Sequence, residues 1–144
     1  MIPQNAHELL RQAADRLGLD ALGVAPAQAP AHASDLHEWL AQSFQGAMDW
    51  MARDPNIRSD PQAYDPMARS ILIAGLSSRQ TSQALPRGRM AAYAQGSDYH
   101  DILREKLNSL AQETIQRWGG NFRVCVDSSP LLEKPLAALA GIGW

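Results

Sequence analysis

Asp127 occupies a position at which a carboxylate could take part in chemistry. It directly follows residues 122–126, whose alternating pattern is typical of a β-strand. It precedes Ser128, Ser129 and Pro130, which are typical of a helix start. Ligands of open α/β sheets bind at the carboxyl ends of strands. We therefore interpret Asp127 either as a helix-capping acid or as a proton donor or ligand contact.

Two further side chains, those of Arg58 and His100, are candidates for a functional role. Arg58 is an isolated cation between turn signals, and it is either a solvated surface arginine or a fork that grips an amide or a phosphate. His100 lies in a stretch that approaches the Asp-x-His-x-x-Gly pattern, which supplies a lower histidine ligand to cobalt in many cobalamin proteins. Leu103 replaces that glycine and continues a helical stripe. His100 is therefore predicted to hydrogen-bond locally at a helix start.

Composition narrows the class of protein. The chain has 144 residues, which favours one domain. Its net charge of −2 shows no excess of positive charge of the kind that indicates nucleic-acid binding. It has no apolar run long enough for a transmembrane helix and no leader pattern, so a cytoplasmic location without membrane association is expected. The single cysteine, Cys125, excludes an intrachain disulfide and a Cys₄ cluster within these residues. No histidine has metal-ligand spacing, so no metal site is predicted.

The elements that would position these residues form a mixed α/β pattern. Asn5 and Glu8 form a capping box ahead of a first helix, and residues 21–25 and 70–76 read as strands. A long helix follows His100, and a last helix contains Pro135. We expect a small mixed sheet covered by helices. Residues 44–51 are rich in aromatics and methionine, and they form either core or lid, or an apolar wall for a flat ligand.

Several stretches, in this order and spacing, resemble the N-terminal half of epoxyqueuosine reductase. They cover nearly the whole chain, and the last two are the most specific. They are LDALGVA (19–25), GAMDWM (46–51), ARSIL (68–72), YAQGSDYHDILR (93–104) and VDSSPLLEKPLA (126–137).

The resemblance implies an oxidoreductase that uses cobalamin, related in its core to reductive dehalogenases, which reduces epoxyqueuosine to queuosine in tRNA. It implies that Asp127 is the proton donor and also contacts cobalamin. Arg58 and Ala91 match cobalamin-contacting positions, and Ala91 can contribute only its backbone. The family binds cobalamin without a lower histidine ligand, and electrons arrive through two [4Fe-4S] clusters.

The chain departs from the family pattern in two ways. Ala92 stands where the family usually has an arginine, which removes a charge that could contact cofactor or tRNA. Family chains also continue past Trp144 into a ferredoxin-like [4Fe-4S] domain and a helical-repeat tail. We therefore expect residues 1–144 to be a single N-terminal cobalamin-binding domain of a monomeric enzyme. The tRNA and the electron donor would be contacted mainly through the missing part.

Two alternative functions remain open at this point. The chain could be a non-catalytic, truncated module that binds a corrinoid or only another protein, which the lack of cluster cysteines favours. It could also serve the reduction of a different small substrate, as the related dehalogenases do.

Overall fold

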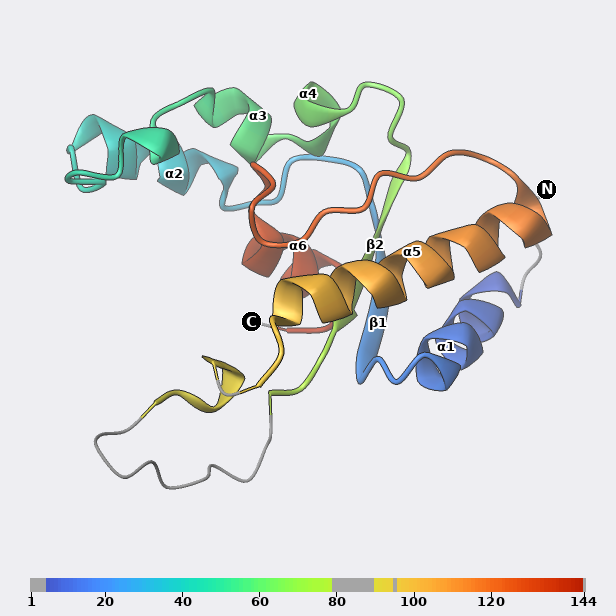
Figure 1. The fold of residues 1–144 in the computed structure, drawn as a ribbon. Helices are drawn as coiled ribbons and strands as arrows, with labels where there is room; N and C mark the ends of the chain where they lie inside the picture. The colour runs from blue at the N-terminus through green and yellow to red at the C-terminus, as the bar shows by residue number, and fades with distance from the viewer. Residues whose placement is uncertain (1–4, 79–89, 95, 144) are drawn as a thin grey trace. The chain divides into compact units, whose positions relative to one another are not determined.

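The computed structural model describes residues 5–78, 90–94 and 96–143 (Figure 1). The α-helices are α1 (Ala6–Arg16), α2 (Ala33–Ala41), α3 (Pro55–Ser59), α4 (Pro61–Tyr64), α5 (Tyr99–Trp118) and α6 (Glu133–Leu139). Two single turns of 3₁₀-helix are η1 (Asp49–Met51) and η2 (Ala92–Ala94), and the strands are β1 (Ala21–Pro26) and β2 (Ser70–Gly75). Within the described ranges, no helix is both long and apolar enough to cross a bilayer.

The sheet is a two-stranded antiparallel pair. Asp20 N donates to Gly75 O at 2.9 Å at one end of the pair, and Ala27 N donates to Arg69 O at 3.1 Å at the other. Both strands begin and end within one residue of the predicted bounds, and the predicted class of a small sheet with helices is confirmed. Residues 122–126, predicted as a further strand, have no regular secondary structure.

The described chain divides into two compact units, which are considered separately. The first consists of residues 1–22 and 74–128, and the second of residues 23–73 and 129–144. Each strand therefore begins in one unit and ends in the other. The prediction of a single domain remains a prediction.

In the first unit, α1 packs against α5. The apolar residues of α1 recur at helical spacing, so they form one face that can be buried against a neighbour. Polar contacts flank this packing: Arg16 Nη2 lies 2.6 Å from Glu113 Oε1, and Lys106 Nζ donates to the carbonyl of Leu17. The buried residues of the unit are Ala6, Leu10, Ala13, Ala14, Leu19, Leu22, Leu110, Ala111, Thr114 and Val126.

In the second unit, α2 and α4 each pack against α3. The buried hydroxyl of Ser59 donates to Pro55 O at 2.8 Å and lies 3.1 Å from His37 Nε2, which ties α3 to α2. Asp60 caps α4 by accepting from Gln62 N at 2.9 Å, with Pro61 at the first helical position.

Two helix starts differ from the prediction. Asn5 makes no side-chain cap at α1, and Glu8 accepts instead from Gln12 Nε2 at 3.1 Å, one turn further along the helix. The last helix, α6, begins at Glu133 rather than at Pro130. Pro135 lies in its first turn, where a missing N–H leaves no intrahelical bond unmade.

Close packing of Gly23 against Ala140 generates a prediction. A Cβ on Gly23 would lie 2.9 Å from Ala140 Cβ and would also collide with the Ala140 carbonyl oxygen. We expect Gly23→Ala to lower the free energy of unfolding by about 1–3 kcal/mol, as overpacking typically does.

The matched control is Gly75→Ala, whose added Cβ would meet Ala21 Cβ at an ordinary 3.4 Å. Urea denaturation of both variants measures the difference. Equal stability of the two variants would contradict the close approach of Gly23 and Ala140.

Candidate active site

Asp127 lies at the centre of a tight three-residue turn. Its φ is 51°, and Ser128 N donates to Val126 O at 2.5 Å across it. A non-glycine residue in this region is uncommon, although aspartate tolerates it better than most residues, and such strain concentrates at functional sites. The buried side chain of Val126 anchors the turn. The Asp127 carboxylate itself is 63% exposed.

The start of α5 supplies the partner of this carboxylate. Asp98 is the N-cap of α5, and its Oδ1 accepts from His100 N at 2.9 Å. The same Oδ1 lies 2.7 Å from His100 Nδ1, so the cap also fixes the imidazole ring. The other ring nitrogen, His100 Nε2, lies 3.2 Å from Asp127 Oδ2. One histidine is thus held between two carboxylates.

Aromatic rings flank this histidine. The ring of Tyr99 stacks on that of His100, with centroids 4.0 Å apart, and Tyr93 meets Tyr99 edge to face at 6.1 Å. Burial raises the pKa of the Tyr99 phenol above its usual 10.0, and the negative charge of Asp127, which also accepts a hydrogen bond from it, raises it further. The Tyr99 phenol therefore stays protonated near neutral pH.

The charges of the cluster stabilise one another. The hydrogen bond to Asp98, followed by that to Asp127, raises the pKa of His100 above its usual 6.5. The backbone hydrogen bond from His100, together with its side-chain contact, lowers the pKa of Asp98 below its usual 3.8. Two carboxylates therefore favour the imidazolium form of His100.

This geometry tests one of the two interpretations of Asp127, that of a helix-capping acid. The N-cap residue of α6 is Leu132, which makes no side-chain cap, and Asp127 points its Oδ2 at His100 instead. The capping interpretation is wrong because the helix begins six residues after Asp127. The prediction that His100 hydrogen-bonds locally at a helix start is confirmed, whereas its contact with Asp127 was missed. That contact joins residues 27 positions apart, and no sequence spacing indicates it.

Arg58 belongs to the second unit and lies in α3. Its side chain is half-buried, with Nη2 donating to Trp50 O at 3.1 Å, so the interpretation as a solvated surface arginine is wrong. Its Nε is buried and makes no hydrogen bond within the described residues. A buried N–H without a partner is costly, so this nitrogen is a candidate donor to a ligand.

The remaining candidates from the sequence are Ala91 and residues 44–51. Ala91 is exposed, and its carbonyl accepts from Ala94 N at 3.0 Å in the turn of η2. Residues 44–51 are not core, because Phe44, Met48 and Trp50 are among the exposed large apolar side chains. In the described part of the chain, no three His, Cys, Asp or Glu side chains are placed to hold a metal ion.

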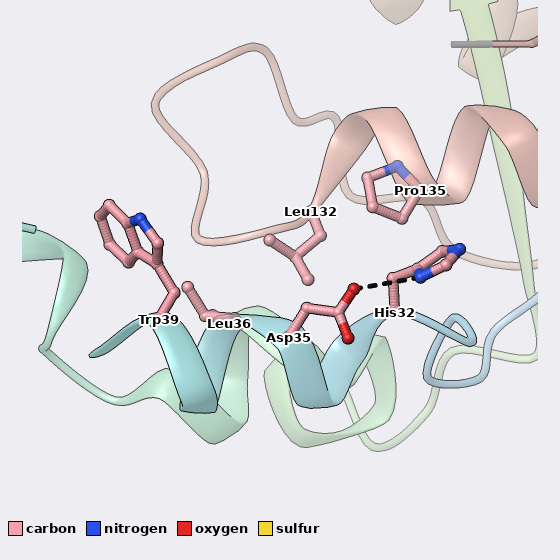
Figure 2. A pocket seen from close by; sticks show the side chains of 6 residues that line it. All are labelled: His32, Asp35, Leu36, Trp39, Leu132 and Pro135. Atoms are coloured by element: carbon pink, nitrogen blue, oxygen red, sulfur yellow. Dashed lines mark hydrogen bonds and ion pairs between the residues drawn. The ribbon is translucent and has the colours of Figure 1, made fainter. Parts of the chain in front are cut away.

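An open groove of about 510 Å³ lies in the second unit and is shown in Figure 2. It is lined by His32, Asp35, Leu36, Trp39, Leu132 and Pro135. His32 Nδ1 lies 3.1 Å from Asp35 Oδ2 along this groove (Figure 2). None of Asp127, Arg58 and Ala91 lines it, so it is distinct from the predicted site residues.

Comparison with known proteins gives these residues a context. A family model described as "Epoxyqueuosine reductase QueG, DUF1730" matches residues 58–128. The epoxyqueuosine reductase of Xanthomonas campestris pv. campestris is 36% identical over 99% of this chain and 42% of its own length. That of Escherichia coli K12 is 35% identical over 89% of this chain and 36% of its own length.

Solved structures agree with the sequence matches. An epoxyqueuosine reductase bound to an epoxyqueuosine-modified tRNA-Tyr stem loop has a TM-score of 0.82 and 27% identity, covering 96% of this chain and 38% of its own. A Bacillus subtilis epoxyqueuosine reductase, with a catalytic aspartate loop swung out of its active site, has a TM-score of 0.74 and 27% identity over the same shares.

The fold therefore defines a helix-covered, two-stranded α/β protein of the kind found within tRNA-modifying reductases. Residues 58–128 match the epoxyqueuosine reductase family model, and nearly the whole chain is similar to curated epoxyqueuosine reductases. It spans about two fifths of the length of the curated relatives it matches.

The Asp98–His100 pair predicts how stability depends on pH. The contribution of Asp98 is present above its usual pKa of 3.8 and is lost as pH falls through its lower folded value. That of His100 is complete below 6.5 and is lost as pH rises through its higher folded value. We expect the melting temperature of Asp98→Asn to change less with pH than that of the unsubstituted protein, on both the acidic and the basic side of the profile. Asparagine keeps the helix cap but loses the charge.

Thermal melts followed by circular dichroism from pH 3 to 9 measure this effect. Asp101→Asn is the control, since Asp101 is an acid of the same helical turn with its own partner, Arg104, at 3.7 Å. An Asp98→Asn profile as steep as that of the unsubstituted protein would count against the pairing.

Proposed function

We propose that this chain is the N-terminal, cobalamin-binding part of a cytoplasmic, monomeric epoxyqueuosine reductase. The complete enzyme would reduce epoxyqueuosine in tRNA to queuosine. The observation that carries the proposal is the 36% identity to a curated epoxyqueuosine reductase over 99% of the chain. The relative solved with a modified tRNA stem loop supports tRNA as the substrate.

Asp127 is the proposed proton donor to the oxygen that leaves the carbon skeleton when the epoxide is reduced. It lies on a loop rather than in a helix, and its carboxylate is exposed enough to meet a substrate. The relative solved with its catalytic aspartate loop swung out of the active site supports a catalytic aspartate on such a loop. Hydrogen bonds from His100 and Tyr99 fix the position of this carboxylate.

Arg58, Ala91 and Asp127 are the proposed cobalamin contacts. The buried, unpaired Nε of Arg58 fits a group rich in amide and phosphate oxygens, which accept hydrogen bonds from a guanidinium. The backbone of Ala91 carries no charge, so it would make a neutral contact with cobalamin. His100 is already held between two carboxylates, which fits a cofactor without a lower histidine ligand. When bound, cobalamin would supply the low-potential electrons and the nucleophilic cobalt for the reduction.

The other parts of the reaction are assigned to the remainder of the enzyme. The chain has one cysteine, Cys125, which is free and half-buried, and the [4Fe-4S] clusters would need several. The net charge of −2 likewise assigns most of the tRNA contact to another part. An electron-donating domain or protein and a tRNA-binding surface are thus the proposed partners.

The assigned role of Asp127 can be tested by Asp127→Asn. Asparagine tolerates the left-handed backbone but donates no acidic proton. With the electron-transfer part supplied, turnover of epoxyqueuosine-containing tRNA should fall at least about 100-fold, while cobalamin binding followed by absorbance is retained. Full turnover in Asp127→Asn would refute the role.

A corrinoid titration tests Arg58. Arg58→Gln should weaken cobalamin binding by about 10- to 100-fold, as the loss of charged hydrogen bonds does, and Arg58→Lys should recover only part of it. Arg53→Gln, an exposed arginine of the same segment, should bind normally. Unchanged affinity in Arg58→Gln, with an unchanged melting temperature, would remove Arg58 from the site.

A further inference from the structure

The contact between His100 Nε2 and Asp127 Oδ2 constrains where protons lie in the cluster. Asp98 Oδ1 lies 2.7 Å from Nδ1, and hydrogen bonds from His100 lower the pKa of Asp98, so this carboxylate is ionised near neutral pH and Nδ1 carries a proton that it donates to Asp98. The 3.2 Å contact at Nε2 is then a hydrogen bond only if one proton lies between nitrogen and oxygen. That proton belongs either to the imidazolium or to the Asp127 carboxyl.

The groups around His100 favour keeping a proton in this contact. Asp98 and Asp127 face its two ring nitrogens, and the neutral phenol of Tyr99 stacks on the ring. Tyr93 reaches the cluster through Tyr99. A cation of the same helix, Arg104, interacts with Asp98 and pairs with Asp101. The cluster thus sets two carboxylates against one imidazolium.

We propose that His100 is a positioning residue that aims the Asp127 carboxylate and returns a proton to it after each turnover. The proposal rests on the proposed role of Asp127 as proton donor. In the step, the Asp127 O–H bond breaks and its proton forms an O–H bond to the epoxide oxygen, which leaves the carbon skeleton as water once it has taken a second proton. The Nε2–H proton of His100 then moves to Asp127, which leaves a neutral imidazole. Water supplies the proton that restores the imidazolium, so no oxidant or reductant is consumed in this relay.

Solvent access suits His100 for this role. Its side chain is 31% exposed, so the ring can exchange protons with water while its two nitrogens remain fixed. Tyr99 also donates a hydrogen bond to Asp127, but its phenol holds its proton too tightly near neutral pH to replace one lost by a carboxyl group. Tyr99→Phe should therefore leave the shape of the pH–rate profile unchanged.

The first measurement is an NMR titration of the histidine rings, which needs no turnover. His100 should titrate above the ordinary histidine range, and both Asp98→Asn and Asp127→Asn should lower its pKa, with the larger fall for Asp98→Asn. The exposed His7 of α1 supplies a reference resonance in the same spectra. An unchanged His100 titration in Asp127→Asn would overturn the proposal.

The second measurement is kinetic, with the electron-transfer part and epoxyqueuosine-containing tRNA supplied. His100→Gln keeps an amide donor near the Nε2 position and cannot titrate. We expect kcat to fall about 100-fold, with KM and cobalamin affinity unchanged, and the basic limb of the pH–rate profile to disappear. Added imidazole should restore part of the rate to His100→Ala, and His7→Gln should behave as the unsubstituted protein.

The outcomes separate this proposal from the one on which it rests. If Asp127→Asn retains full turnover, the proposed function of Asp127 fails, whatever His100 does. If Asp127→Asn is inactive and His100→Gln keeps its rate and pH profile, the relay through His100 is overturned while Asp127 stands as the acid.

Discussion

The double contact of Asp98 at the start of α5 is the interaction on which the candidate site depends. One carboxylate oxygen closes the first turn of a 20-residue helix and, through Nδ1, sets the orientation of the His100 ring. A helix start has unpaired N–H groups and a partial positive charge, so an acid is strongly favoured there for reasons of folding alone. The same acid then determines which nitrogen of His100 faces Asp127. Folding and site geometry therefore share a single residue.

Local sequence signals predicted the elements well where local physics decides them. The short apolar runs of β1 and β2 and the apolar stripe of the long helix α5 all depend on neighbours within one or two turns of chain. The signal failed at residues 122–126, because an alternating run forms a strand only if a partner strand offers it hydrogen bonds. The prediction of a helix start at Pro130 was also wrong, because a favourable start sequence does not by itself fix the first helical residue.

The site was predictable in its residues and unpredictable in its geometry. The resemblance in the Val126-Asp127-Ser128 stretch singled out Asp127, and the Asp98-Tyr99-His100 stretch stood out for the same reason. Neither stretch indicates that the two meet, since the contact closes a loop that contains nearly all of α5. The half-burial of Arg58 was equally hidden, because a turn-flanked arginine has the same sequence signature whether it is solvated or packed.

The division into two units has a consequence for how the protein is made. Each unit is assembled from two separate stretches of chain, so neither is complete until a late segment has been synthesised. During translation, the first unit would lack its helix α5 until well after its first helix has emerged, and the second would lack α6 longer still. Contacts between such distant stretches form slowly, because a long loop must close before they stabilise anything. The nascent chain would therefore expose the apolar face of α1 for much of its synthesis, a period in which chaperones could bind it.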